Sequence, residues 1–136
     1  MAKETPRAKA LKTLQKLVRL KAADDNGYCT CVTCGAIGKW TEFDGGHFIP
    51  KGNSSRWALE EKNIHPQCKS CNAFGMRFGT ATQAYTTYMI DYYGRDFVDH
   101  MLATKGDLHK LGKRDYEEMI KDWNEQIKHH LKRIGH

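Results

Sequence analysis

Four cysteines in two Cys-x-x-Cys pairs are the residues of this sequence best suited to hold a metal ion. Cys31 and Cys34 form the first pair, and Cys68 and Cys71 form the second. Thiolates are soft ligands that suit Zn²⁺, and two such pairs can close a tetrahedral site across a long loop. A four-cysteine site leaves no position for a reacting water, so we expect a structural zinc. Cys29 is expected to be a spare, with a register that uses Cys29 in place of Cys31 as the alternative.

Between and after these pairs lie residues that suit a harder ion. Asp44 and His47 fall inside the loop, Asn63 precedes the second pair, and Asn72 directly follows its last cysteine. Carboxylate and amide oxygens suit Mg²⁺ or Mn²⁺, whereas a neutral histidine is a general base for water near neutral pH. Hydrolysis of a phosphodiester needs such a base, together with an ion that stabilises the leaving oxygen. The set therefore indicates phosphodiester chemistry, although His47 alone would more often be a packed histidine.

The same residues carry a family resemblance. The sequence resembles the HNH, or His-Me finger, nucleases, whose site is a two-stranded hairpin followed by a helix. It looks most like the lambda NinG (Rap) family of phage recombination endonucleases, through the segments CVTC, DGGHFIP and NIHPQCKSCN and a basic N-terminal helix. Phage endonuclease VII, a junction resolvase of the same superfamily, is similar at the same places. The motif-bearing part covers residues 29–72.

The resemblance implies a role for several of these residues. His47 would be the general base, and Asn72 would ligate the catalytic Mg²⁺ or Mn²⁺. Asn63 matches the middle Asn of the HNH pattern, which ties the loop together and orients the histidine. His65 joins the predicted catalytic set as a residue that either points toward the ion or the scissile phosphate or belongs to the framework.

One position departs from the family pattern. Many HNH sites carry an Asp or His immediately before the catalytic histidine as an ion ligand, and here that position is Gly46. Asp44 is the nearest carboxylate, and we expect a bend or bulge at Gly45-Gly46 to bring it to the ion.

The positive charge of the chain is concentrated at its N-terminus. The formal net charge is +6, and residues 1–21 hold seven basic groups against the single acid Glu4, while the rest of the chain is balanced. Such a concentration is expected of a segment that contacts a polyanion such as DNA. The predicted DNA-binding residues are Lys9, Lys12, Lys16 and Arg19, with Lys51, Arg56 and Arg77 near the cut. The alternative for each is an ordinary solvated charge.

Helical periodicity places these groups. Thr5 and Pro6 predict an N-cap and first helical residue, followed by a helix to about Ala23 that has leucines on one side and the basic groups on the other. A further helix is expected to start near Pro66, one to end at Gly94, a shorter one to span residues 95–106, and a last one to run from about Lys113 to Ile134. The apolar stripe of this last helix predicts packing on the core, or a homodimer interface.

The predicted fold class is α+β and mostly helical. We expect a ββα-metal core (residues 28–80) stapled by the zinc site, a basic N-terminal helix (1–27) and C-terminal helices (81–136), in one domain overall. The chain has no apolar run as long as a membrane span and no secretory signal, so we expect a cytoplasmic protein, and the resemblance implies a phage-encoded one in a bacterial host.

Two functions of different classes follow. The first is a metal-dependent DNA endonuclease, which by resemblance would act on branched or recombination-intermediate DNA, such as a Holliday junction or flap. The alternative is a non-catalytic zinc module that binds nucleic acid, which would have no need of Asp44, His47 and Asn72.

Overall fold

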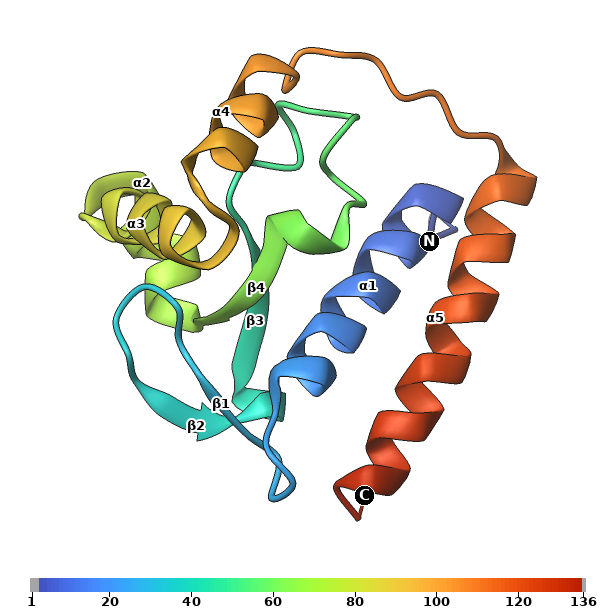
Figure 1. Cartoon of the computed structure of the whole chain (residues 1–136). Helices are drawn as coiled ribbons and strands as arrows, with labels where there is room; N and C mark the ends of the chain where they lie inside the picture. Colours follow the sequence, from blue (N-terminus) through green and yellow to red (C-terminus); the bar gives the residue numbers. More distant parts are fainter. Residues whose placement is uncertain (1–2, 136) are drawn as a thin grey trace.

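A computed structural model describes residues 3–135 of the chain, so the outermost residues of the first and last predicted segments lie outside the described part. Within these residues the main elements are five α-helices and four short strands (Figure 1). In chain order they are α1 (Pro6–Ala22), β1 (Tyr28–Thr30), β2 (Ile37–Lys39), β3 (Phe43–His47), β4 (Ile64–Cys68), α2 (Met76–Phe78), α3 (Ala81–Tyr93), α4 (Arg95–Ala103) and α5 (Lys113–Arg133). The predicted mixed and mostly helical class is confirmed.

Helix α1 begins and packs as its sequence predicts. The Thr5 hydroxyl accepts a hydrogen bond from the backbone N–H of Ala8 at 3.1 Å, and Pro6 takes the first helical position. The predicted apolar side, Leu11, Leu14, Leu17 and Val18, is buried. This side packs on β3 and β4, so α1 covers the hairpin that carries the predicted site.

The β3–β4 hairpin is regular throughout, which corrects the expected bulge. Its antiparallel register pairs Gly45 with Pro66 and Gly46 with His65 without an extra residue. A Cβ on Gly45 would lie 2.9 Å from the Gln15 Cα, so this glycine lets α1 approach the strand.

The helix expected to start near Pro66 begins later, because residues 64–68 form β4. Proline is tolerated in this strand because its backbone faces away from β3, and its carbonyl accepts from the Val32 N–H at 3.0 Å. After β4 the chain turns through a π-helical segment, Cys71–Gly75, into α2. The hairpin is thus followed at once by a helical turn that starts at Cys71.

The C-terminal helices divide between two apolar clusters. Helices α3 and α4 pack with the loop after β3, in a cluster that includes Phe48, Trp57, Tyr85 and Met101. Helix α5 instead runs beside α1 in the same direction and belongs to the cluster around Leu14 and Leu17 (Figure 1). The predicted packing stripe of α5 is confirmed, since Ile120 and Ile127 are buried within the chain. No helix among residues 3–135 is long and apolar enough to cross a membrane.

Candidate active site

The four predicted zinc ligands form one cluster. Cys31 and Cys34 lie in the turn between β1 and β2, Cys68 ends β4, and Cys71 begins the helical turn. Their four sulfur atoms lie within 4.8 Å of one another, and those of Cys34 and Cys68 are 3.8 Å apart. A tetrahedral zinc site with Zn–S bonds of about 2.3 Å places its sulfurs roughly 3.8 Å apart. The cluster therefore fits a zinc ion in both chemistry and spacing.

Cys29 lies outside this cluster, which decides between the two registers. Its buried thiol donates a hydrogen bond to the Arg19 carbonyl at 3.2 Å, and burial raises its pKa to about 11. Burial also raises the pKa of Cys31, but hydrogen bonds from the Thr33 hydroxyl and from backbone groups outweigh it and lower that pKa to about 6. Cys31 is therefore the thiol better prepared to bind as a thiolate.

A second group of predicted residues lines a cleft of about 520 Å³ beside β3. Asp44, His47 and Asn72 all lie on this cleft, together with the basic residues Lys51 and Arg77. Asp44 accepts a hydrogen bond from the Asn72 amide N–H at 3.1 Å and forms an ion pair with the Lys69 ammonium at 2.8 Å. Both side chains carry hard oxygen donors of the kind that Mg²⁺ and Mn²⁺ prefer, and in this structure the Asn72 amide nitrogen, not its oxygen, faces Asp44. The regular strand brings Asp44 to Asn72 without the expected bend.

One ring nitrogen of His47 forms a hydrogen bond within the chain. Its Nε2 lies 2.8 Å from the Ala58 carbonyl oxygen, which can only accept, so Nε2 carries the proton. Its Nδ1 then has the lone pair, and among residues 3–135 it has no hydrogen-bond partner. Burial lowers the pKa of His47 to about 4, with the charges of Lys51 and Arg7 acting in the same direction. The ring is neutral at pH 7 and can accept a proton at Nδ1.

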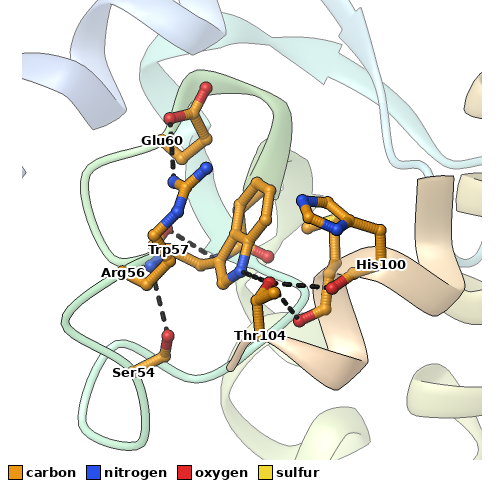
Figure 2. Close-up of polar contacts among 8 residues, drawn as sticks. Ser54, Arg56, Trp57, Glu60, His100 and Thr104 are labelled. Atoms are coloured by element: carbon orange, nitrogen blue, oxygen red, sulfur yellow. Dashed lines mark hydrogen bonds and ion pairs between the residues drawn. The ribbon is translucent and has the colours of Figure 1, made fainter. Parts of the chain in front are cut away.

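The loop that carries the Ala58 carbonyl is fixed by buried polar groups. Asn63 is fully buried, and its side chain bonds the backbone N–H and carbonyl of Ile49 and the carbonyl of Trp57 at 2.8–3.1 Å. These hydrogen bonds go to the backbone and not to the His47 ring, so Asn63 positions the loop. Figure 2 shows a second anchor, in which the Trp57 indole N–H donates to the hydroxyl of Thr104, the C-cap residue of α4; this hydrogen bond is 3.0 Å long.

His65 does not lie on this cleft. Its Nε2 is 2.8 Å from the Tyr93 hydroxyl and its Nδ1 is 3.1 Å from that of Tyr85. Tyr85 donates to the Gly46 carbonyl at 2.7 Å, so it accepts from His65 Nδ1, and Tyr93 donates to Nε2. Both ring nitrogens are occupied inside a group of tyrosines, and burial lowers the pKa of His65 to about 4. Of the two positions expected for His65, the structure shows the one in the framework.

Two of the predicted DNA-binding arginines have partners within the chain. The Arg19 guanidinium is half-buried and donates to the carbonyls of Trp40 and Phe43, so it holds α1 to the start of β3. Arg56 stacks on the Trp57 ring at 4.2 Å and pairs with Glu60 at 3.5 Å, away from the cleft (Figure 2). Both guanidiniums have partners within the chain itself, and their contact with DNA stays a prediction.

The remaining basic residues of α1 are less constrained. Lys12 pairs with Glu4, Lys9 lies exposed beside α5, and Lys16 is half-buried. Fewer basic side chains than expected are therefore free along α1.

Sequence reasoning missed Lys69, whose ammonium pairs with Asp44. Its place between Cys68 and Cys71, on the turn that also carries Asn72, could have pointed to it. Tyr85 was missed as well, and no motif marks it, because its contact with Gly46 depends on how α3 packs on the hairpin.

Residues 2–133 match the sequence family described as Bacteriophage Lambda NinG protein. Protein ninG of Escherichia phage lambda is 25% identical over 124 residues, which cover 86% of this chain and 58% of that protein. Protein ninG of Escherichia phage 933W is 26% identical over 96 residues, or 71% of this chain and 46% of that protein. The chain thus spans about half the length of these relatives, and no solved structure matches it.

Proposed function

The chain belongs to the family of the bacteriophage lambda NinG protein, and from that premise we propose that it is a metal-dependent DNA endonuclease that hydrolyses phosphodiester bonds. One observation carries the proposal: Asp44, His47 and Asn72 line a single cleft in which His47 is neutral and its Nδ1 has no partner among the described residues. A module that only bound nucleic acid would need none of these three groups.

Each residue of the cleft has a part in the proposed reaction. His47 Nδ1 takes the proton of the attacking water, while the Ala58 carbonyl holds the ring in the required tautomer. Asp44 and Asn72 hold a divalent ion, which when bound would stabilise charge on the phosphate and on the leaving 3′ oxygen. Lys51 and Arg77, on the same cleft, bind the DNA backbone next to the cut.

Lys69 has a different part in this account. Its ammonium pairs with the Asp44 carboxylate at 2.8 Å. With Asp44 holding a divalent ion, the Lys69 ammonium would be free to contact a phosphate of the DNA. Ion binding and DNA binding would then support each other at this cleft.

The order of elements supports the assignment to the HNH, or His-Me finger, class. The hairpin β3–β4 ends with His47 opposite Ile64, and the following helical turn carries Asn72. The four-cysteine cluster binds a structural zinc that holds these parts together. Its ligands come from the β1–β2 turn and from the end of the hairpin. Following the resemblance, we propose branched or recombination-intermediate DNA as the substrate, in the cytoplasm of a phage-infected bacterium.

A cleavage assay on Asp44→Ala and Asn72→Ala tests the proposal. Zinc-loaded wild type should cut labelled junction, flap and duplex DNA with Mg²⁺ or Mn²⁺ and stop with EDTA. Each variant should keep its zinc and lose cleavage by about a hundredfold or more, since the ion supplies several kcal/mol of charge stabilisation. Cleavage that continues undiminished in both variants would place the ion elsewhere and reject this cleft.

A further inference from the structure

Gln67 on β4 has an unusual side chain for a buried residue. It is fully buried, and its Oε1 is the only buried side-chain oxygen or nitrogen of residues 3–135 without a hydrogen-bond partner. Gln67 pairs with Asp44 across the hairpin, so both side chains lie on the same face of the sheet. A buried acceptor without a partner is costly, which points to a group that this oxygen binds.

The zinc cluster fixes the direction of the Gln67 amide. The amide Nε2 lies 3.2 Å from the Thr33 hydroxyl, and that hydroxyl lies 3.2 Å from the Cys31 sulfur. A zinc-bound thiolate can only accept, so the Thr33 O–H donates to Cys31 and its lone pairs accept from Gln67 Nε2. The amide is then held with Oε1 on the side away from the zinc.

Gly46 shows where that oxygen points. A Cβ on Gly46 would lie 1.8 Å from Gln67 Oε1 and 3.0 Å from Asn72 Oδ1. Both oxygens therefore converge over the bare Cα of Gly46, and Asn72 also contacts Asp44. Gly46 is the position at which many HNH sites carry an ion ligand of their own. Here the space that such a side chain would fill contains the Gln67 amide.

We propose that Gln67 Oε1 is a further ligand of the divalent ion held by Asp44 and Asn72, supplied across the hairpin in place of a side chain at Gly46. Thr33 is its positioning residue and links the zinc cluster to the ion. The inference rests on the proposed function, because it concerns the same ion. An amide oxygen is a hard, neutral donor, which suits Mg²⁺ or Mn²⁺.

Mn²⁺ binding to the zinc-loaded chain, measured by electron paramagnetic resonance without DNA, tests the proposal. Gln67→Met keeps the size of the side chain and removes the oxygen, and should weaken Mn²⁺ binding by at least about tenfold while zinc content is unchanged. Gln67→Glu should bind Mn²⁺ more tightly than wild type. Gln83→Met, on the exposed side of α3, is the matched control and should bind like wild type.

Thermal unfolding separates ligation from packing. Without Mn²⁺, Gln67→Met should melt at the same temperature as wild type or higher, because it removes an unpartnered acceptor, and added Mn²⁺ should stabilise it less. Thr33→Ser keeps the hydroxyl and should bind Mn²⁺ as wild type does. Thr33→Val, with zinc verified, should bind it more weakly because the amide is free to turn.

Asp44→Ala distinguishes failure of the proposed Gln67 ligand from failure of the proposed ion site itself. One outcome is that wild type binds Mn²⁺, that Asp44→Ala no longer binds it, and that Gln67→Met keeps full affinity. In that case Gln67 is not a ligand and its oxygen binds only a water, while the proposed ion site stands. If wild type itself binds no Mn²⁺, or Asp44→Ala binds it as tightly as wild type, the ion site of the proposed function fails, and the role of Gln67 fails with it.

Discussion

At the scale of single residues, burial keeps two histidines neutral: His47 on the cleft and His65 in the framework. The pKa values of His47 and His65 are both lowered to about 4, against an ordinary value of 6.5. For His47 this leaves Nδ1 available as a base at neutral pH, whereas for His65 the two tyrosine hydroxyls use both nitrogens. The same burial can therefore prepare one ring for chemistry and fix the other in the framework.

These lowered pKa values predict how stability depends on pH. In the unfolded chain both histidines take up protons near pH 6.5, whereas in the folded chain they stay neutral down to about pH 4. Between these values the unfolded state binds more protons, so the free energy of unfolding should fall as the pH is lowered from 6.5 toward 4. Denaturant unfolding of the zinc-loaded chain at pH 7, 6 and 5 measures this slope.

The variant His65→Gln supplies the control for that slope. Glutamine does not titrate, so the variant should lose stability less steeply over the same range than wild type does. A free energy of unfolding that is unchanged between pH 7 and 5 would show that the histidines are not held neutral in the folded chain.

Residue types and spacing predicted much of the cleft, and tertiary partners decided the remainder. Asp44, His47 and Asn72 were predicted from their chemistry and their places around the cysteine pairs, and they line one cleft. The partners of His65 come from α3, and those of Arg19 are backbone carbonyls. Neither set of partners could be found from spacing along the chain.

At the scale of elements, the β1–β2 turn and the end of β4 are joined through the cysteine cluster. Both strands of the β1–β2 hairpin are three residues long, too short to be stable alone, so we expect its position to depend on a zinc ion held by the four cysteines. Cys31→Ala should lose zinc and destabilise the chain by several kcal/mol or more, since structural zinc contributes about 10–16 kcal/mol to the folding of zinc-finger peptides. Cys29→Ala should keep one zinc per chain, because Cys29 lies outside the cluster.

Metal analysis together with thermal unfolding checks this pair of variants. Equal zinc content and equal melting temperature in Cys31→Ala and wild type would contradict the four-cysteine site. Loss of zinc in Cys29→Ala alone would favour the other register of the first cysteine pair.

The glycines of β3 give a second prediction at this scale. A Cβ on Gly45 would lie 2.9 Å from the Gln15 Cα, which belongs to the backbone of α1, so Gly45→Ala should force the helix and strand apart. We expect a loss of about 1–3 kcal/mol in the free energy of unfolding, as for other overpacked sites. Gly52→Ala, with no neighbour within 4 Å, should change it by less than about 0.5 kcal/mol. Denaturant titration compares the two, and equal effects would refute the close approach of α1 to β3.

Element boundaries were predicted well where caps mark them and poorly where a strand depends on pairing. Thr5-Pro6 and Gly94 placed helix ends correctly. Pro66 indicated a helix start, but it lies inside β4, because the neighbouring strand and Val32 determine which backbone groups need partners. That information comes from residues distant in the sequence.

At the scale of the whole molecule, the N-terminal concentration of positive charge is only partly free. Arg19 is committed to backbone carbonyls and Lys12 to Glu4, whereas Lys51 and Arg77 lie at the cleft. The proposed DNA-binding surface therefore centres on the cleft more than on α1. The sequence showed how much charge was present but not which groups were already paired.

Salt dependence of DNA binding tests this placement. Lys51→Ala and Arg77→Ala should each weaken binding and lower the slope of log K against log salt concentration by about 1, as expected for loss of one phosphate contact. Arg114→Ala, an exposed residue of α5 outside the cleft, should leave the slope unchanged. Arg19→Ala should lower stability instead. A slope that depends on Arg114 as much as on Lys51 would place the DNA elsewhere.

The most direct test of the central claim is cleavage by His47→Ala beside wild type. Both proteins, with zinc content verified, are given labelled duplex, flap and four-way junction DNA with Mg²⁺, Mn²⁺ or EDTA. The account predicts that wild type cuts only with an added ion, and that the variant keeps zinc and DNA binding but loses cleavage by about 10²–10⁴-fold, the usual contribution of a general base. If both proteins bind these substrates and neither cuts any of them, the chain is a zinc-stabilised nucleic-acid-binding module, and the endonuclease account is wrong.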